Sequence, residues 1–116
     1  MTPKQETGNK AEEMAAKMLE KKGYEILERN YTFGKGEIDI IAERSGWLVF
    51  VEVRARSNTD YGFPEQTISK TKANLIKKTA ENYIYENDWH GNVRFDIVAI
   101  LVGQTFEIQH FEDAFF

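Results

Sequence analysis

The chain has 116 residues, a formal net charge of −4, 41% hydrophobic residues, 29% charged residues and no cysteine. This length and balance predict one globular domain with a single core, and they exclude a disordered or membrane protein. Without cysteine the chain can form no disulfide, thiolate metal site or cysteine nucleophile, which favours a cytoplasmic location. No apolar segment has the length of a signal peptide or a membrane span.

The first predicted element is a helix that Asn9 caps and that runs to Lys22, where Gly23 supplies a stop signal. We expect residues 1–8 to form a flexible tail and residues 9–116 to form the single domain.

Glu12 and Glu13 are adjacent on this helix but not equivalent. A helix turns by about 100° per residue, which places Glu12 on the apolar arc between Ala15 and Ala16 and Glu13 on the polar side. The helix dipole favours an acid near the N-terminus, which explains a glutamate there but not its direction. The alternative is that Glu12 points toward the element on which the helix packs.

The rest of the chain predicts three strands, a second helix and two further strands. Their ranges are Tyr24–Tyr31, Glu37–Glu43, Trp47–Arg56, Ser69–Asn87, Val93–Val102 and Thr105–Phe111. The short turn Arg44-Ser45-Gly46 predicts that the second and third strands form an antiparallel hairpin. The first strand is expected at an edge of the sheet because its outward positions are charged. The third is expected at the centre because both its faces are apolar.

Basic residues concentrate between the third strand and the second helix. The stretch from Arg54 to Lys78 has a local net charge of +4, and its basic residues are Arg54, Arg56, Lys70, Lys72, Lys77 and Lys78. One interpretation is a basic face that contacts a nucleic-acid backbone. The other is a solvated, lysine-rich helix surface.

Four acids occupy positions at which packing favours hydrocarbon, namely Glu12, Asp39, Glu52 and Asp96. A buried carboxylate is normally paired, hydrogen-bonded or bound to a metal. A hairpin that brings Asp39 and Glu52 onto one face raises the pKa of at least one of them unless a cation intervenes. Oxygen ligands without cysteine suit Mg²⁺ or Mn²⁺ better than zinc.

Each of these acids also has a structural explanation. Asp39 or Glu52 could pair with Arg54, and Asp96 could bond to a backbone amide. The histidines, His90 and His110, lack the spacing of a metal-binding pair, so we predict that both are structural or surface residues.

A divalent ion beside a cationic side chain can lower the pKa of a bound water and neutralise charge on a phosphoryl oxygen, which is the chemistry of phosphodiester hydrolysis. The arrangement of Asp39 with Glu52-Val53-Arg54 resembles the PD-(D/E)XK nuclease superfamily. The predicted element order, αβββαβ with a final strand, is similar to the restriction-endonuclease-like α/β fold of that superfamily, a mixed central sheet flanked by helices.

A more specific resemblance extends from Gly8 to about Ala99. Several linked motifs resemble the YraN-like family, which is similar in fold to archaeal Holliday-junction resolvases. These motifs are Glu12 with Ala15-Ala16, Lys22-Gly23-Tyr24-Glu25-Ile26-Leu27, Asn30, Gly36-Glu37-Ile38-Asp39-Ile40-Ile41-Ala42, Val49-Phe50-Val51-Glu52-Val53-Arg54 and Arg94-Phe95-Asp96-Ile97-Val98.

The resemblance implies that Glu12, Asp39 and Glu52 ligand or position a Mg²⁺ or Mn²⁺ ion and that Arg54 takes the place of the catalytic lysine. It places Gln66 at the rim of the site. Arg54 stays charged and can stabilise a developing phosphorane, but it cannot exchange a proton at neutral pH. The substitution therefore leaves the metal site intact and puts turnover in question, whereas Ile38 in place of the superfamily's proline matters little for chemistry.

Three functions are open at this point. The first is a metal-dependent endonuclease that hydrolyses DNA, including branched or structured DNA, with contacts to the backbone from Arg56, Gln66, Lys70, Lys72, Lys77 and Lys78. The second is a nucleic-acid-binding module of the same fold with little catalysis. The third is a structural or protein-interaction domain whose acids are paired internally.

A small nuclease domain would need a second copy to cut two strands symmetrically. The aromatic residues Phe111, Phe115 and Phe116 are a candidate surface for such a homodimer, and the alternative is that they fold back on the core.

Overall fold

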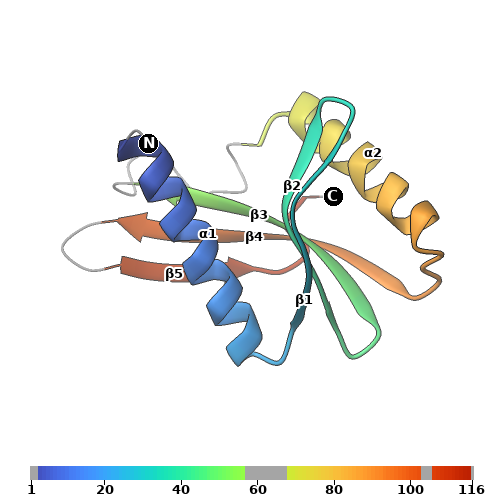
Figure 1. Cartoon of the computed structure of the whole chain (residues 1–116), viewed down its shortest axis with the longest axis horizontal. Helices are drawn as coiled ribbons and strands as arrows, with labels where there is room; N and C mark the ends of the chain where they lie inside the picture. Colours follow the sequence, from blue (N-terminus) through green and yellow to red (C-terminus); the bar gives the residue numbers. More distant parts are fainter. Residues whose placement is uncertain (1–2, 57–67, 103–105, 116) are drawn as a thin grey trace.

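The structure, a computed structural model, describes residues 3–56, 68–102 and 106–115 (Figure 1). Two helices and five strands follow one another as α1 (Pro3–Lys21), β1 (Glu25–Phe33), β2 (Gly36–Arg44), β3 (Trp47–Arg56), α2 (Lys70–Glu86), β4 (Asn92–Val102) and β5 (Phe106–Phe111). This is the predicted order of elements. No helix among the described residues is long and apolar enough to cross a bilayer.

The five strands form one mixed sheet in the order β1-β2-β3-β4-β5. β3 and β4 pair in parallel, whereas the β1/β2, β2/β3 and β4/β5 pairs are antiparallel. Parallel neighbours need a crossover connection, and α2 lies within it. The predicted positions of β1 at an edge and β3 at the centre are confirmed. The arrangement is that of a restriction-endonuclease-like α/β fold.

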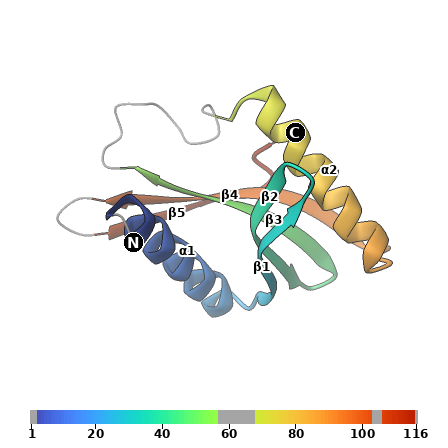
Figure 2. The same cartoon turned by 45° about the horizontal axis from the view of Figure 1, so that its top comes forward.

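The two helices cover opposite faces of the sheet (Figures 1 and 2). Alternate residues of a strand point to opposite faces, so β3 contributes to two separate clusters. Val49 and Val51 pack with α1, and Leu48 and Phe50 pack with α2. All four are at most 1% exposed, which explains why β3 is apolar on both faces.

The first helix begins at Pro3, so the prediction of a start at Asn9 is wrong, and residues 3–8 belong to the helix. Proline is favoured at the first position of a helix, because its missing N–H would have no partner there. Gly8 was the apparent break, but a glycine inside a helix costs only about 1 kcal/mol.

The turn between β1 and β2 is shorter than expected, and β2 already begins at Gly36. Gly36 is buried against α2. A Cβ at this position would overlap Thr79 Oγ1 and lie 2.8 Å from the carbonyl oxygen of Leu75. The absence of a side chain at Gly36 therefore lets the start of β2 lie directly on α2.

The predicted start of α2 is confirmed, and one of the two alternatives for the terminal aromatic residues is observed for Phe115. Ser69 caps α2, and its side chain accepts a hydrogen bond from the amide of Lys72 at 3.1 Å. At the other end of the chain, Phe115 packs on Phe95 with ring centroids 5.9 Å apart. Phe115 thus folds back on the core, while Phe116 lies outside the described residues.

Candidate functional site

β2 and β3 separate at the residue that carries the first predicted acid. Their regular pairing ends at Ile40 and Val51, so that Asp39 and Glu52 are the next residues along the two strands. There the amide of Val53 donates a hydrogen bond to Asp39 Oδ2 at 2.8 Å. The side chain of Asp39 thus replaces a backbone partner of β3, which holds its carboxyl group beside Glu52.

Asp39 and Glu52 form a pair of carboxyl groups, as the hairpin predicted. Burial raises the pKa of Asp39, a hydrogen bond with Glu52 and repulsion from its charge raise it further, and the Val53 amide lowers it, for a net value of about 8. Glu12 adds a small further repulsion. Near neutral pH Asp39 therefore keeps its proton unless a cation replaces it.

Glu52 is 7% exposed, and its Oε2 atom has no hydrogen-bond partner among the described residues. Lys72 Nζ lies 2.7 Å from this oxygen, although in a direction that does not make a hydrogen bond. The interaction is therefore an ion pair between a buried carboxylate and an ammonium group whose side chain is 49% exposed.

Glu12 approaches this pair from α1. Burial raises its pKa, Arg29 lowers it, and the charges of Glu37 and Glu52 raise it again. The amide of Asn30 bridges two of these acids when its nitrogen faces them, with Nδ2 2.8 Å from Glu12 Oε1 and 3.2 Å from Glu37 Oε1. This orientation is required because a carboxylate can only accept. α1, β1, β2 and β3 therefore contribute to one acidic cluster.

Asn30 has an unusual backbone for a strand residue, with φ 55°. Its neighbours in β1 pair normally with β2, Arg29 with Ile40 and Tyr31 with Ile38. Asparagine tolerates the left-handed region better than most residues, and such conformations concentrate at functional sites. The left-handed turn at Asn30 accompanies the contact of its amide with the acids.

The acids Glu37, Asp39 and Glu52 line a pocket of about 300 Å³ between β2, β3 and α2. The rest of its lining consists of Lys35, Gly36, Lys72, Leu75 and Ile76. Among the described residues, no three acidic or histidine side chains already converge closely enough to hold a metal ion. The structure brings Asp39 and Glu52 together, and Glu12 lies close enough to affect both electrostatically.

Arg54, two residues after Glu52 on β3, is half-buried. The pKa of Arg54 is lowered, chiefly by burial of the guanidinium and also by the charge of Arg56. The charges of Glu52 and Asp39 raise this pKa but do not offset the effect of burial. Its Nε is buried and has no hydrogen-bond partner within the described part of the chain. Arg54 is thus a cation near both acids, but its guanidinium is in no ion pair with either of them among the residues that the structure describes.

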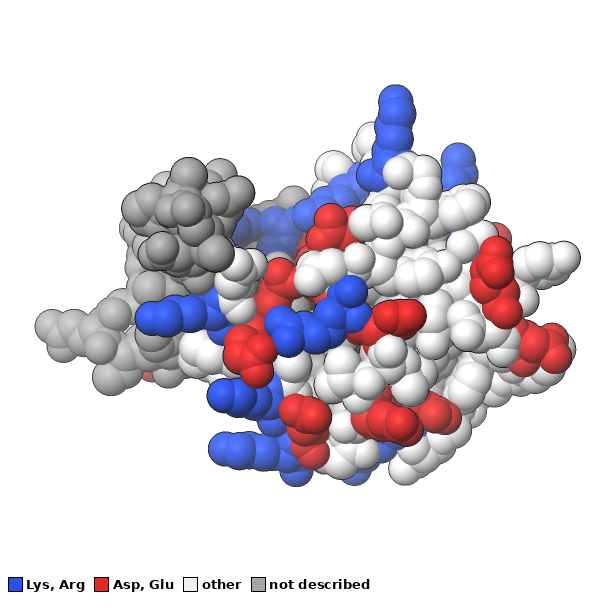
Figure 3. Space-filling view, viewed as in Figure 1, with Lys and Arg blue, Asp and Glu red and all other residues white. Residues whose placement is uncertain are grey.

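The predicted basic residues do not all lie together. Of the lysines on α2, Lys72 lines the acidic pocket. Lys77 and Lys78 are exposed farther along the helix, Arg56 is half-buried at the end of β3, and Gln66 lies outside the described residues. In Figure 3, basic and acidic side chains are interspersed among the described residues between α1 and the β1–β2 hairpin.

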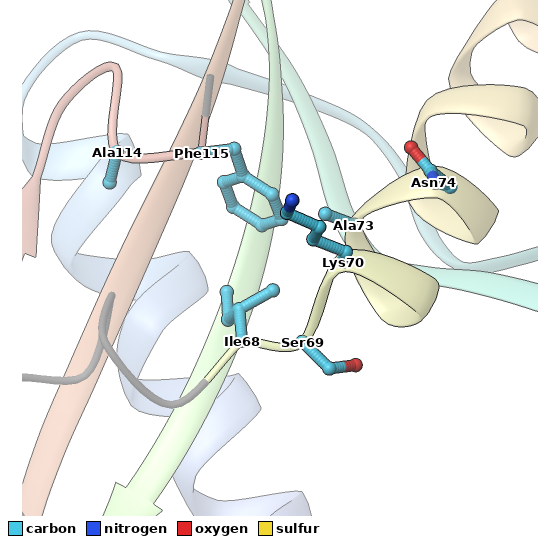
Figure 4. Close-up of a pocket in the computed structure, with 7 residues that line it drawn as sticks. All are labelled: Ile68, Ser69, Lys70, Ala73, Asn74, Ala114 and Phe115. Atoms are coloured by element: carbon cyan, nitrogen blue, oxygen red, sulfur yellow. The ribbon is translucent and has the colours of Figure 1, made fainter.

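A second and larger cavity of about 360 Å³ lies at the start of α2 (Figure 4). Its lining is Ile68, Ser69, Lys70, Ala73, Asn74, Ala114 and Phe115, with the ring of Phe115 extending toward Lys70 and Ala73. No acid belongs to this lining. Despite its smaller volume, the acidic pocket is therefore the better candidate for chemistry.

Asp96 belongs to a different, structural network. It is fully buried and receives hydrogen bonds from Arg94 at 2.8 and 2.9 Å, from His110 Nε2 at 2.7 Å and from the amide of Asp113 at 2.9 Å. Burial alone would raise the pKa of Asp96, but these hydrogen bonds outweigh burial and lower it. The structural interpretation of Asp96 and His110 is therefore confirmed.

Three polar residues of the pocket and its surroundings were not predicted to belong to the site, namely Lys35, Glu37 and Asn30. Lys72 was predicted as a contact to DNA rather than as a partner of Glu52. An asparagine within a strand was a usable signal, since asparagine is enriched at positive φ. Nothing in the local sequence indicates the pairing of Lys72 with Glu52, because it depends on how α2 lies across the sheet.

Comparisons with known proteins agree with the motifs. The model of the family described as "Uncharacterised protein family UPF0102" matches residues 11–100. A UPF0102 protein of Flavobacterium psychrophilum is 43% identical over 117 residues, which cover 100% of this chain and 98% of the relative. A UPF0102 protein of Cytophaga hutchinsonii is 46% identical over 93 residues (80% and 82%), and one of Persephonella marina is 45% identical over 104 residues (89% and 90%). The residues matched by the family model include Glu12, Asp39, Glu52 and Arg54.

Proposed function

This chain belongs to the uncharacterised protein family UPF0102, which confirms the YraN-like resemblance, and we propose that it is a divalent-metal-dependent endonuclease that hydrolyses phosphodiesters in DNA. The observation that carries the proposal is the pair Asp39 and Glu52. Glu52 is buried, Asp39 is partly buried beside it with a raised pKa, and the two residues lie where β2 and β3 separate.

The donor set suits a hard divalent cation. Asp39 and Glu52 would hold Mg²⁺ or Mn²⁺ through oxygen atoms, and Glu12 would ligand or position it from α1. When bound, such an ion activates a water molecule and neutralises charge on a phosphoryl oxygen. The ion pair of Glu52 with Lys72 supports this fit, since a cation already lies 2.7 Å from Glu52 Oε2.

The remaining side chains supply binding and charge stabilisation. Arg54 is half-buried near both acids and would stabilise the negative charge that develops on the phosphoryl oxygens. Because a guanidinium keeps its proton at neutral pH, Arg54 would act only as a cation. We propose that Arg56, Gln66, Lys70, Lys72, Lys77 and Lys78 contact the DNA backbone, and that two copies of the chain act together where both strands are cut.

A cleavage assay tests the proposal. The protein is incubated with junction, flap, duplex and single-stranded DNA in Mn²⁺ or Mg²⁺, alongside the double variant Asp39→Asn/Glu52→Gln. Glu81→Gln, which removes an exposed acid of α2, is the matched control. We expect cleavage by the wild type and by Glu81→Gln and none by the double variant. Equal residual cleavage by all three proteins would show contamination and refute the proposal.

A second candidate function rests on Arg54 in the place of a lysine. With a cation that cannot exchange protons, the site would bind nucleic acid and cleave it feebly or not at all. This alternative predicts salt-sensitive DNA binding that EDTA does not change and that weakens when the lysines of α2 are neutralised. Absence of both DNA binding and a Mn²⁺-dependent rise in the unfolding midpoint would instead favour a structural domain.

A further inference from the structure

We propose that Lys72 is a resident counter-ion of the site: it neutralises Glu52 while no metal is bound, and metal binding releases its ammonium group to hold a phosphate of the substrate. The inference rests on the proposed function and goes beyond it, because it assigns one lysine two exclusive partners. It also predicts that the metal and the phosphate bind cooperatively.

The first support is the position of Lys72 on α2. A helix repeats its face after about 3.6 residues, so Lys72 shares a face with Ile76, Thr79 and Tyr83, and those three residues are buried. Lys70, Lys77 and Lys78 fall on other sides of the helix. Lys72 also lies in the first turn of α2, where its backbone amide donates a hydrogen bond to Ser69 Oγ at 3.1 Å. Its backbone is therefore fixed at the rim of the acidic pocket.

The second support is the balance of charge around Glu52. Its side chain is only 8% exposed, and Lys72 Nζ at 2.7 Å is the cation that reaches Oε2 within the described part of the chain. Arg54 influences Glu52 electrostatically but forms no ion pair with it among the described residues. A buried carboxylate without a counter-ion is strongly destabilising, so Lys72 has a clear function in the metal-free site.

The third support is that a metal ion can replace Lys72 beside Glu52. The side chain of Lys72 is 49% exposed, and lysine carries its charge on a flexible four-carbon chain. A half-exposed ion pair is weaker than a fully buried one, since water can solvate the ammonium group after it leaves. A metal ion and the ammonium group cannot occupy the same position on Glu52 Oε2. Metal binding at this oxygen therefore displaces Lys72.

The displaced ammonium group remains within reach of the same pocket of about 300 Å³, which Lys35 also lines. It would face the position at which a phosphate approaches the metal site. Each ligand then favours the other: metal binding frees Lys72 for the phosphate, and a phosphate that binds Lys72 frees Glu52 for the metal. Such coupling is reciprocal by thermodynamic linkage.

The test measures Mn²⁺ binding to the full chain directly, by the fall in the electron paramagnetic resonance signal of free Mn²⁺, without any need for turnover. The variants are Lys72→Gln, Lys72→Arg and, as a matched control, Lys78→Gln, a lysine of the same helix outside the acidic pocket. Binding of a fluorescein-labelled DNA junction is measured in EDTA and in Mn²⁺. Thermal unfolding shows which variants are folded.

We expect Lys72→Gln to bind Mn²⁺ about two- to tenfold more tightly than the wild type in the absence of DNA, because its competitor is gone. The same variant should lose the gain in DNA affinity that Mn²⁺ gives the wild type. Lys78→Gln should keep the wild-type Mn²⁺ affinity and the gain in DNA affinity that Mn²⁺ gives, although its DNA affinity should fall equally in EDTA and in Mn²⁺ because one contact to the DNA backbone is lost. Lys72→Arg keeps a cation beside Glu52, so its Mn²⁺ affinity should not exceed that of the wild type. This variant also tests the inference if Lys72→Gln does not fold.

The outcomes separate the inference from the proposed function. If the wild type binds Mn²⁺ and cuts DNA while Lys72→Gln shows unchanged or weaker Mn²⁺ affinity, only the counter-ion inference fails. An equal gain in Mn²⁺ affinity in Lys78→Gln would also overturn it, because the effect would then be one of overall charge. If the wild type binds no Mn²⁺ and cuts no DNA, both the proposed function and the inference fail.

Discussion

Asp39 Oδ2 accepts a hydrogen bond from the amide of Val53 at 2.8 Å, at the point where β2 and β3 cease to pair. This contact explains how an acid comes to lie inside a sheet. The side chain takes over a bond that the backbone of β2 no longer makes, and the strand separation opens the pocket beside Glu52. The same contact means that changes at Asp39 affect stability as well as the proposed chemistry.

Asp39→Asn should change how stability depends on pH. The folded pKa of Asp39 is raised from 3.8 to about 8, so the unfolded chain loses this proton first. The contribution of Asp39 to the free energy of unfolding is therefore fully present below about pH 4 and declines as the pH rises toward 8. Asparagine keeps the acceptor for Val53 and never ionises. We expect the variant, measured in EDTA, to be more stable than the wild type near pH 8 by about 1–3 kcal/mol.

Urea unfolding of both proteins between about pH 5 and pH 8 measures this effect, since titrating groups that do not interact with Asp39 cancel in the difference. The advantage of Asp39→Asn should shrink as the pH falls toward the unfolded pKa of 3.8. Parallel curves for the two proteins over the whole range would contradict the raised pKa of Asp39.

Asp96→Asn should be far more damaging to the fold than to the site. It leaves Arg94 and His110 with an incomplete partner in a fully buried network, which costs about 3–5 kcal/mol. Because the pKa of Asp96 is lowered, its stabilisation is present above the unfolded value and is lost as pH falls through the folded pKa. The measurement is the free energy of unfolding from urea titration.

The protein offers a matched control for this variant. Asp88 and His90 form the same kind of pair at 2.8 Å on the surface, where their side chains are 87% and 82% exposed. Asp88→Asn should change stability by less than about 0.5 kcal/mol. A similar cost for the two variants would show that the buried network contributes no more than a surface pair.

Gly36→Ala tests whether the start of β2 must lie directly on α2. The added Cβ meets Thr79 Oγ1 and the carbonyl oxygen of Leu75, so we expect a loss of about 1–3 kcal/mol in the free energy of unfolding. Adding Thr79→Ala should restore part of the loss, since it removes one of the two clashes. Gly34→Asn is the control, because a Cβ at Gly34 meets nothing within 4 Å and asparagine tolerates its φ of 59°. Equal effects of Gly36→Ala with and without Thr79→Ala would contradict this account.

Asn30 combines a backbone role with a side-chain role, and two variants separate them. Asn30→Gly keeps the positive φ but removes the amide that bridges Glu12 and Glu37, whereas Asn30→Ala removes the amide and adds left-handed strain of about 1 kcal/mol. We expect the alanine variant to be the less stable of the two in urea. Both should show the same reduced affinity for Mn²⁺, because both release Glu12. Wild-type Mn²⁺ affinity in the glycine variant would show that the bridge does not support the site.

Much of the fold could be predicted because its signals are local and repeated. The alternation of apolar residues along β3 placed Leu48 and Phe50 on one face and Val49 and Val51 on the other. Short turns imposed the hairpins, and Ser69 marked the start of α2. The start of α1 was predicted wrongly because Gly8 and Asn9 resemble a helix boundary, while the cost of a glycine within a helix is small compared with the gain from continuing it.

The sequence by itself predicted a hairpin that could bring Asp39 and Glu52 together, and in the structure they are the next residues beyond the last pair, Ile40 and Val51. It also determined the family, through motifs spread from Glu12 to Asp96. Only the tertiary structure decided which acids belong together: Asp96 is satisfied by Arg94 and His110, whereas Glu52 depends on Lys72. The physical reason is that the free energy of a buried charge depends on the atoms beside it. For Glu52 these come from α2, whose position is set by packing across the sheet rather than by any local pattern.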